Sequence, residues 1–284
     1  MAEIDLFKPE ISQVVKGIDG KILLIYGCNK CGKTYNAVQA PKPLVLAFEQ
    51  GLGALDGVPF FPIRTWSEFR SIVRKLSDPK NFDALHEKYN TIIVDAIDGI
   101  EKLSDRYVCS SLGINHIREY NGGYGAWKEW GDEIESQLRP LAFSGFTVIF
   151  IGHEGTRKFL AEDGKTEYEM VYPRGDKRVV DPILNYVDLT CYVRLGGAKD
   201  TGDQELSTLY LKATVASSPA AVSRKSVRPS ANGPTPILRK LWSKPLSAAK
   251  RRAGSKPSPM PKRVRWKSPK KRRKKHKSSR FPCW

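Results

Sequence analysis

Short, continuous apolar runs recur through the first 213 residues of the chain. Most are rich in β-branched or aromatic side chains, and they do not alternate with polar residues. Strands of this kind are typical of a parallel sheet whose two faces are both covered by helices. The pattern therefore predicts an α/β fold built on a mostly parallel, twisted sheet. The runs span 21–26, 43–48, 58–63, 91–94 and 146–152, and Pro62 weakens the third as a central strand.

Helical spacing of apolar positions fills the intervals between these runs. It predicts helices over 66–77, 97–108 and 126–142, and a further helix that opens after residue 34. Beyond residue 152 the chain changes character, because two polar β runs flank the turn Asp163-Gly164 and two more β runs follow. These features predict an antiparallel C-terminal extension of the sheet. The last two runs span 185–195 and 206–213.

Charge divides the chain at about residue 214. Residues 1–213 contain all 30 acidic residues and 26 of the 48 basic ones, whereas residues 214–284 contain 22 basic residues and no acidic one. Periodicity also stops there, and Pro, Ser, Ala, Lys and Arg dominate. A chain of this composition cannot bury enough apolar surface to fold. We therefore expect one folded domain over 1–213, with a net charge of −4, and a disordered basic tail over 214–284.

Three interpretations of the tail stay open. Its segment 269–277, PKKRRKKHK, is suited to nonspecific nucleic-acid binding through counterion release, and it also has the composition of a nuclear address. The third interpretation is translation out of frame, which we favour, because average usage predicts about eight or nine acidic residues in a segment of this length.

Cellular context follows from what the chain lacks. No apolar run approaches the roughly 18 residues of a membrane span, and the first ten residues do not form a signal peptide, so a soluble cytoplasmic protein is expected. Five cysteines, an odd number, argue against a disulfide framework and for a reducing compartment. The pair Cys28 and Cys31 has no second pair with which to form a structural zinc site.

The segment from Gly27 to Thr34 matches G-x-x-x-x-G-K-[ST] at every fixed position. Glycine lets the backbone approach phosphate, and successive N–H groups supply positive potential. Lys33 is expected to reach the β- and γ-phosphates, and the Thr34 hydroxyl to bind magnesium. A chance match arises in about one chain in a hundred of this length. The pattern predicts an ATP and Mg²⁺ site formed by Gly27, Cys28, Asn29, Lys30, Cys31, Gly32, Lys33, Thr34 and Tyr35.

Polar residues that follow the other strands are candidates for the remaining chemistry. Asp95 ends the run 91–94 and is expected to support the metal, while Glu49 is a candidate for activating water. His153 follows the run 146–152, where it is expected to contact the γ-phosphate. The alternatives are an exposed loop glutamate and an ordinary loop histidine. Asp98 and Glu101 are expected to cap and flank the next helix.

With these elements in order, the chain resembles the RecA-like P-loop ATPases, particularly compact phage-encoded members implicated in single-strand annealing and recombination. The likeness covers about residues 5–213 and rests on LLIYGCNKCGKT, VLAFEQGLGAL, TIIVDAIDGIEKL and FTVIFIGHEG. It implies that Glu49 activates water and that His153 occupies the place of a glutamine that couples nucleotide state to DNA. It also implies a ring or filament in which Lys177 or Arg178 enters the neighbouring subunit's site.

The same resemblance implies single-stranded DNA as a partner, contacted through residues 109–125 and 154–176. For the aromatic residues there, the alternatives are stacking on bases and a place in the core. For the basic residues, the alternatives are contact with phosphates and a solvated position on a loop. The long strand-exchange segments of full-size members are missing. The stacking candidates are Tyr120, Tyr124 and Trp127, and the phosphate candidates are Arg157, Lys158 and Arg174.

Three functions remain in competition. The first is a magnesium-dependent ATPase that assembles on single-stranded DNA. The second is a small-molecule or nucleotide kinase, with PRGDKR at 173–178 as a basic lid. The third is a DNA-binding protein whose nucleotide site does not hydrolyse ATP.

Overall fold

The computed structural model describes residues 17–160, 164–195, 207–213 and 223–225. All of them belong to one compact unit, residues 1–246. The predicted disorder of the tail falls outside the described residues, apart from the three-residue strand β9, Ser223–Lys225. The turn residue Asp163 also lies outside them.

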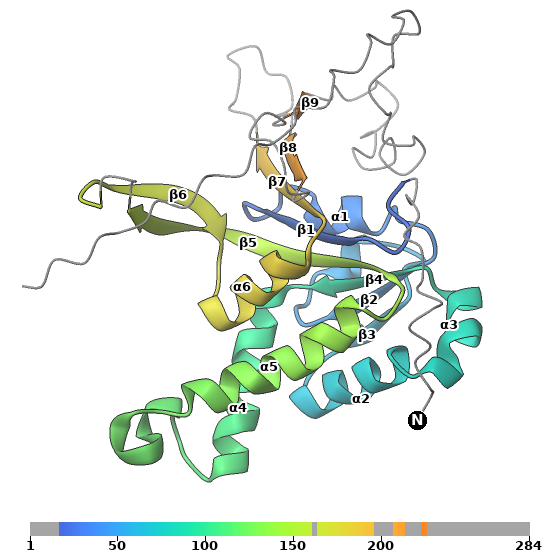
Figure 1. Cartoon of the computed structure of the whole chain (residues 1–284). Coiled ribbons are helices and arrows are strands. Elements are labelled where there is room, and N and C mark those ends of the chain that lie inside the picture. The colour runs from blue at the N-terminus through green and yellow to red at the C-terminus, as the bar shows by residue number, and fades with distance from the viewer. Residues whose placement is uncertain (1–16, 161–163, 196–206, 214–222, 226–284) are drawn as a thin grey trace, which may run out of the picture. The chain divides into compact units, whose positions relative to one another are not determined.

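A single sheet forms the centre of this unit (Figure 1). Its strand order is β3-β2-β4-β5-β1-β7-β8-β9, with β6 paired to β5 alone. Pairing is parallel from β3 through to β7, and β8 and β9 continue the sheet antiparallel. The predicted α/β fold with an antiparallel C-terminal extension is confirmed. The strands are β1 Ile22–Gly27, β2 Pro43–Ala47, β3 Phe60–Pro62, β4 Thr91–Asp95, β5 Thr147–Leu160, β6 Glu167–Pro173, β7 Leu189–Leu195 and β8 Ser207–Ala213.

Helices pack on both faces of the sheet, which explains why its strands are apolar without alternation. Successive residues of β1 point to opposite faces of the sheet, so Leu24 packs in the larger core and Ile25 in the smaller one. The larger core also holds apolar residues of α2, α4, α5 and α6, and the smaller one holds Ala37 of α1. The helices are α1 Lys33–Ala37, α2 Trp66–Leu76, α3 Phe82–Lys88, α4 Ile97–Leu112, α5 Trp127–Ala142 and α6 Lys177–Tyr186, with 3-10 turns at η1 Leu52–Ala54, η2 Pro79–Asn81 and η3 Ile117–Gly123.

The three predicted covering helices are confirmed as α2, α4 and α5. Helix α2 begins where its sequence dictates, because Thr65 and Glu68 form a reciprocal capping box. Helix α6 was not predicted, and it occupies the first two residues of the run 185–195. Its buried side consists of only three residues, Val179, Val180 and Ile183. Pro182 lies inside the helix and made a helix hard to predict there, because proline is unfavourable in a helix interior.

Two predictions about the later strands are wrong in detail. Strand β7 pairs parallel with β1, so the antiparallel pairs of this part of the chain are β5 with β6, β7 with β8 and β8 with β9. Strand β5 does not end at Gly152, because the chain continues extended to Leu160 and pairs there with β6. The resulting hairpin projects from the sheet at the side of α6 (Figure 1). His153 therefore lies within a strand, at the last position where β5 pairs with β1.

Candidate nucleotide site

The loop between β1 and α1 is closed on one side by β7. Gly27, the last residue of β1, pairs with His153 of β5 and with Val193 of β7. A Cβ atom on Gly27 would lie 2.0 Å from the carbonyl oxygen of Val193, so no other residue fits there. Gly32 opens α1 with a φ of 84°, a left-handed conformation that favours glycine. The two fixed glycines of the motif are therefore required by the backbone.

The Lys33 side chain lies inside this loop. Its Nζ atom donates hydrogen bonds to the carbonyls of Gly27, at 3.1 Å, and Cys28, at 2.6 Å. Only 6% of the residue is exposed. A buried ammonium group at the centre of this loop complements the negative charge of a nucleotide's phosphates.

Thr34 and Asp95 meet directly across the carboxyl ends of the strands. The Thr34 hydroxyl donates to Oδ2 of Asp95 at 2.8 Å, which joins the start of α1 to the end of β4. Burial raises the pKa of the Asp95 carboxyl, and the Thr34 hydrogen bond opposes that effect. A hydroxyl beside a carboxylate is an oxygen donor set that suits Mg²⁺. The residues present therefore fit the metal that the motif implies.

Glu49, Asp98 and His153 converge beside this pair. One ligand atom of each lies within 4.8 Å of the others. The loop that carries Glu49 is tied to the end of β4, since the N–H groups of Phe48 and Glu49 donate to the Asp95 carbonyl at 2.7 and 3.3 Å. The Glu49 side chain is exposed. The structure thus brings two sequence candidates, Glu49 and His153, together with Asp98, for which no catalytic role was predicted.

Asp98 does not cap its helix, and that prediction is wrong. The N-cap of α4 is Ala96, and no side chain caps it. The Asp98 carboxylate instead accepts from Nδ1 of His153 and from Nε of Arg174, both at 2.7 Å. Burial alone would raise the pKa of Asp98, but the hydrogen bonds from His153 and Arg174 outweigh it and lower that pKa.

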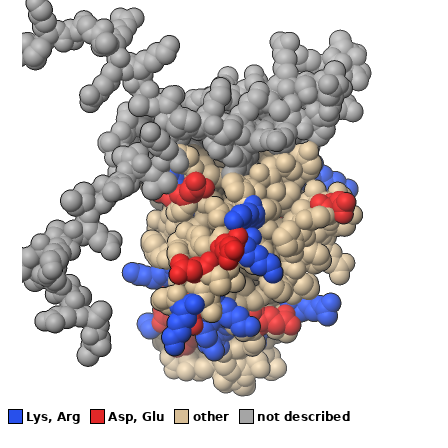
Figure 2. Space-filling model, turned by 90° about the vertical axis from the view of Figure 1, so that its right-hand side faces the viewer, with Lys and Arg blue, Asp and Glu red and all other residues tan. Residues whose placement is uncertain are grey.

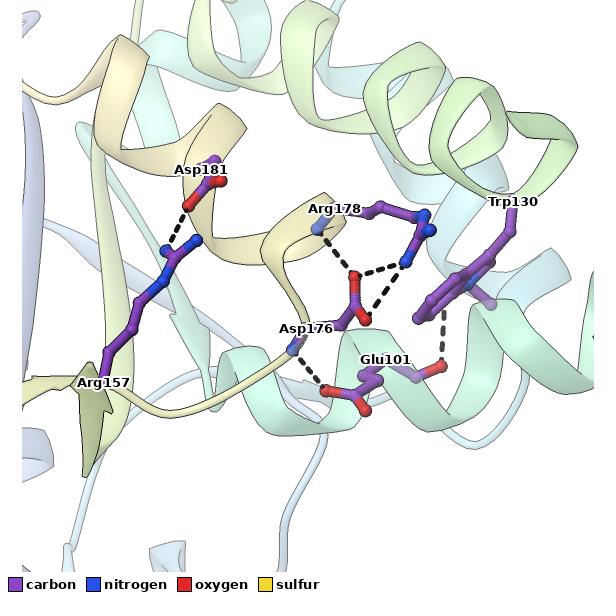
Figure 3. A network of polar contacts seen from close by, with 7 residues as sticks. Glu101, Trp130, Arg157, Asp176, Arg178 and Asp181 are labelled. Carbon is purple, nitrogen blue, oxygen red and sulfur yellow. Dashed lines mark hydrogen bonds and ion pairs between the residues drawn. The ribbon is translucent and has the colours of Figure 1, made fainter. Parts of the chain in front are cut away.

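Glu101 also acts outside its own helix. Its Oε2 atom accepts from the backbone N–H of Asp176 at 2.9 Å, just before α6 (Figure 3). The sequence contained one signal for these roles, since the three-residue spacing of Asp98 and Glu101 places both on one face of a helix. Their partners, Arg174 and Asp176, are distant in the sequence and were not recognisable.

Lys177 and Arg178 begin α6 and differ in their surroundings. Arg178 is half-buried and donates to both carboxylate oxygens of Asp176 at 3.0 and 3.2 Å (Figure 3). Its guanidinium carbon lies 4.5 Å from the ring centre of Trp127. Lys177 is exposed. The contacts described for Arg178 lie with α5 and its own helix cap, not with the loop 27–34.

Other residues of the predicted nucleotide loop have distinct environments. Asn29 and Lys30 are exposed, and Lys30 adopts a φ of 59°. Cys31 is buried, and this burial raises the pKa of its thiol to about 11. Tyr35 is 37% exposed and lines a groove of about 410 Å³ together with Val38 and residues 54–59. That groove, next to the phosphate loop, was not foreseen from the sequence.

Basic side chains predicted to contact DNA are paired within the chain. Arg157 bonds Asp181 at 2.9 Å, Lys158 lies 3.6 Å from Glu167, and Arg174 holds Asp98. Among the aromatic candidates, Trp127 stacks on Arg178 and Tyr120 packs against the larger core, whereas Tyr124 is 83% exposed. The face in Figure 2 shows acidic and basic side chains interspersed.

Comparison with known proteins gives one family match and several distant likenesses. The model of a family described as AAA domain matches residues 19–218. The SPbeta prophage-derived uncharacterized protein YorG of Bacillus subtilis (strain 168) is 40% identical over 211 residues, which cover 74% of this chain. The chain spans 62% of that relative's length.

Two solved structures share the general layout at low similarity. The KaiC-like protein PH0186 of Pyrococcus horikoshii OT3 is 11% identical, with a TM-score of 0.42 over 76% of this chain and 88% of that one. The RadB recombinase is 14% identical, with a TM-score of 0.38 over 69% and 82%. Similarity at this level adds nothing to the argument.

Among the described residues no helix is long and apolar enough to cross a membrane. The family match covers most of the folded domain, including the loop from Gly27 to Thr34 and the strand that ends at Asp95. The chain therefore belongs to the AAA-domain family, and its prophage-derived relative agrees with the predicted resemblance to phage-encoded proteins.

Proposed function

We propose that this chain is a magnesium-dependent ATPase that acts on single-stranded DNA in recombination or annealing. One observation carries the hydrolytic part of the proposal: three functional elements meet at the carboxyl ends of the parallel strands. They are the buried ammonium of Lys33, the hydrogen-bonded pair Thr34–Asp95, and Glu49 beside His153.

Each residue has a defined part in this reaction. Thr34 and Asp95 would hold magnesium, which when bound would neutralise charge on the phosphates. Lys33 exchanges its loop carbonyls for phosphate oxygens and stabilises the negative charge that spreads over them during transfer. Glu49 orients the attacking water and accepts its proton, since its carboxylate is exposed at the strand ends. His153 senses the γ-phosphate.

The neighbouring copy completes the site in the proposed ring or filament. Of the two candidates for a residue acting in trans, Lys177 is favoured over Arg178. Lys177 is exposed, whereas Arg178 already bonds Asp176 and stacks on Trp127. A cation supplied from outside stabilises the transferring phosphoryl group.

The proposed DNA contact rests on individual exposed side chains rather than on a basic patch. Tyr124, in the loop between α4 and α5, exposes 83% of its surface and offers a ring on which a base can stack. The hairpin supplies Lys158, whose side chain is largely exposed. The resemblance to phage-encoded relatives supplies the other support for a DNA partner.

Phosphate release from ATP, measured with and without single-stranded DNA, tests the proposal. DNA should increase turnover severalfold, and Lys33→Ala should lower it by about a hundredfold or more. Glu49→Gln should lower turnover by about 10²-fold while nucleotide still binds. Lys75→Ala, at an exposed lysine of α2, is the matched control and should retain activity.

Three results would contradict particular parts of the proposal. Equal turnover with and without DNA, over a range of salt concentrations, would remove the DNA role. Transfer of phosphate to an acceptor, in place of its release, would identify a kinase. Unchanged turnover in Glu49→Gln would exclude that residue as the group that activates water.

A further inference from the structure

Asp98 occupies a position between the nucleotide site and the base of the β5–β6 hairpin. Its side chain is 10% exposed, and its two oxygens have separate partners. Oδ2 is 2.7 Å from Nδ1 of His153, and Oδ1 is 2.7 Å from Nε of Arg174. A single carboxylate therefore connects a residue beside the phosphate loop to a residue that follows β6.

The segment 174–176 is fixed from a second direction. Its first N–H, that of Arg174, donates to the His153 carbonyl at 2.8 Å, and the N–H of Asp176 donates to Glu101 at 2.9 Å. Gly175 lies between them with a φ of 138°. A Cβ atom there would be 3.2 Å from Val180 and 3.5 Å from Glu101, so the segment lies close against α4 and α6.

Asp98 and Glu101 are one helical turn apart on α4, which follows directly from the strand that carries Asp95. Together they hold the connection from β6 to α6, and α6 begins with Lys177 and Arg178. A shift of α4 or of the His153 ring changes the hydrogen bonds that fix this connection. A physical chain of contacts thus leads from the phosphate loop to the hairpin and to the proposed trans-acting lysine.

We propose that Asp98 is a positioning residue, which ties His153 to the segment 174–176 so that movement of the imidazole on nucleotide binding reaches the hairpin base and the start of α6. This inference rests on the proposed function in that it needs nucleotide to bind near His153. It names the route by which the nucleotide site regulates the surfaces that meet DNA and the next subunit.

Charge explains why a carboxylate is needed at this position. The lowered pKa of Asp98, set by the hydrogen bonds of His153 and Arg174 against the effect of burial, keeps it ionised at neutral pH. An ionised carboxylate accepts from both donors at once, and hydrogen bonds to a charged acceptor are about twice as strong as neutral ones. Asparagine has one acceptor oxygen and an NH₂ group that faces another donor. Asp98→Asn therefore breaks one of the two connections with almost no change in volume.

Hydrogen exchange of the full chain, with and without Mg²⁺ and a non-hydrolysable ATP analogue, tests the connection. In the wild type, nucleotide should change exchange of the amides of residues 174–178 by about threefold or more. In Asp98→Asn this change should disappear, although the analogue still binds. Glu101→Gln should speed exchange at Asp176 whether or not the analogue is present.

Controls separate a positioning role from a general loss of structure. Asp98→Glu keeps the charge and should retain at least part of the nucleotide-dependent change. Asp105→Asn, a matched change two turns further along α4, should behave as the wild type. A double variant, Asp98→Asn with Arg174→Gln, should show no more loss than Asp98→Asn alone, because both remove the same connection.

Distinct results would overturn this inference and the proposed function. If the analogue binds and Asp98→Asn keeps the wild-type exchange response, or if the wild type shows no response, Asp98 does not couple the two regions. Failure of the analogue to bind would overturn both proposals. Absence of hydrolysis or of DNA stimulation, with the exchange result as expected, would count against the proposed function alone.

Discussion

The two halves of β5 have opposite surroundings within one strand. From Thr147 to Gly152 every residue is buried, and the strand pairs in parallel with β1 and β4. From His153 to Leu160 the residues are half-buried or exposed, and beyond His153 the strand pairs only with the antiparallel β6. His153 is the first residue of the outer half, and it still lies beside Gly27.

This comparison shows how a fixed scaffold and a responsive arm can share one element. The inner half is held by two neighbouring strands and by helices on both faces, so its position is set by the whole core. The outer half has one neighbouring strand and depends on local contacts, such as those of Arg157 with Asp181 and Tyr172. Segments with few buried contacts have low local stability and are suited to move on ligand binding.

The largest expected effect comes from removing a large buried side chain from the inner half of β5. Phe150→Ala removes a side chain with 0% exposure from the larger core and should lower the free energy of unfolding by about 3–5 kcal/mol. Phe159→Ala, the matched change in the outer half, removes a half-buried ring that contacts Tyr168 and Tyr172, and should cost less than about 1.5 kcal/mol. Denaturant unfolding of both variants measures the difference. Equal losses would mean that the hairpin belongs to the same rigid unit as the sheet.

The next effect tests how tightly the sheet encloses the phosphate loop. Gly27→Ala forces a methyl group against the Val193 carbonyl, so the variant should lose about 1–3 kcal/mol of stability and bind no nucleotide. Gly53→Ala is the control, because nothing lies within 4 Å of its added Cβ and the residue lies inside the 3-10 turn η1, a backbone conformation that alanine adopts. Titration with a fluorescent ATP analogue compares them. Nucleotide affinity of wild-type strength in Gly27→Ala would refute the close contact.

A smaller effect is expected at the exposed aromatic side chain of the α4–α5 loop. Tyr124→Ala should weaken single-stranded DNA binding by about tenfold, since stacking of one base contributes about 1–3 kcal/mol. Its ATP turnover without DNA should not change. Tyr120→Phe, at a residue packed against the core, provides a comparison in which the ring is kept. Fluorescence anisotropy with a labelled oligonucleotide gives both affinities, and unchanged binding by Tyr124→Ala would exclude this contact.

The smallest effect concerns the buried carboxyl of the inner region. Because burial raises the pKa of Asp95 above its unfolded value, ionisation of this group lowers stability as pH rises through that range. Asp95→Asn removes the charge and keeps an acceptor for Thr34, so the melting temperature at pH 7 should rise by about 2 °C or more. The gain should vanish below about pH 3, where the carboxyl is protonated in both states. A fall in melting temperature at pH 7 would contradict this account.

Patterns that depend on local sequence and two-sided burial were sufficient to predict much of the fold. The strands around Leu24, Val45 and Ile93 are apolar on both faces, and the loop from Gly27 to Thr34 has a spacing set by phosphate chemistry. Asp95 was found because it ends an apolar run. These features are visible without knowledge of what packs against them.

What the sequence did not predict depends on contacts between distant segments. Helix α6 is amphipathic over a short length and gains its stability by packing on α5 and α4. The part played by Asp98 depends on Arg174, which is brought to it only by the β5–β6 hairpin. The roles of Glu49, Lys177 and Arg178 remain predictions, since each depends on a nucleotide or on a second subunit.

The contact between Gly27 and the Val193 carbonyl sets an order for events during translation. The phosphate loop is made early in synthesis, but one of its walls belongs to β7, which leaves the ribosome much later. A nascent chain that ends after β5 has the complete loop sequence and lacks that wall. We therefore expect nucleotide to stabilise the nascent chain fully only when residues 189–195 have joined the sheet.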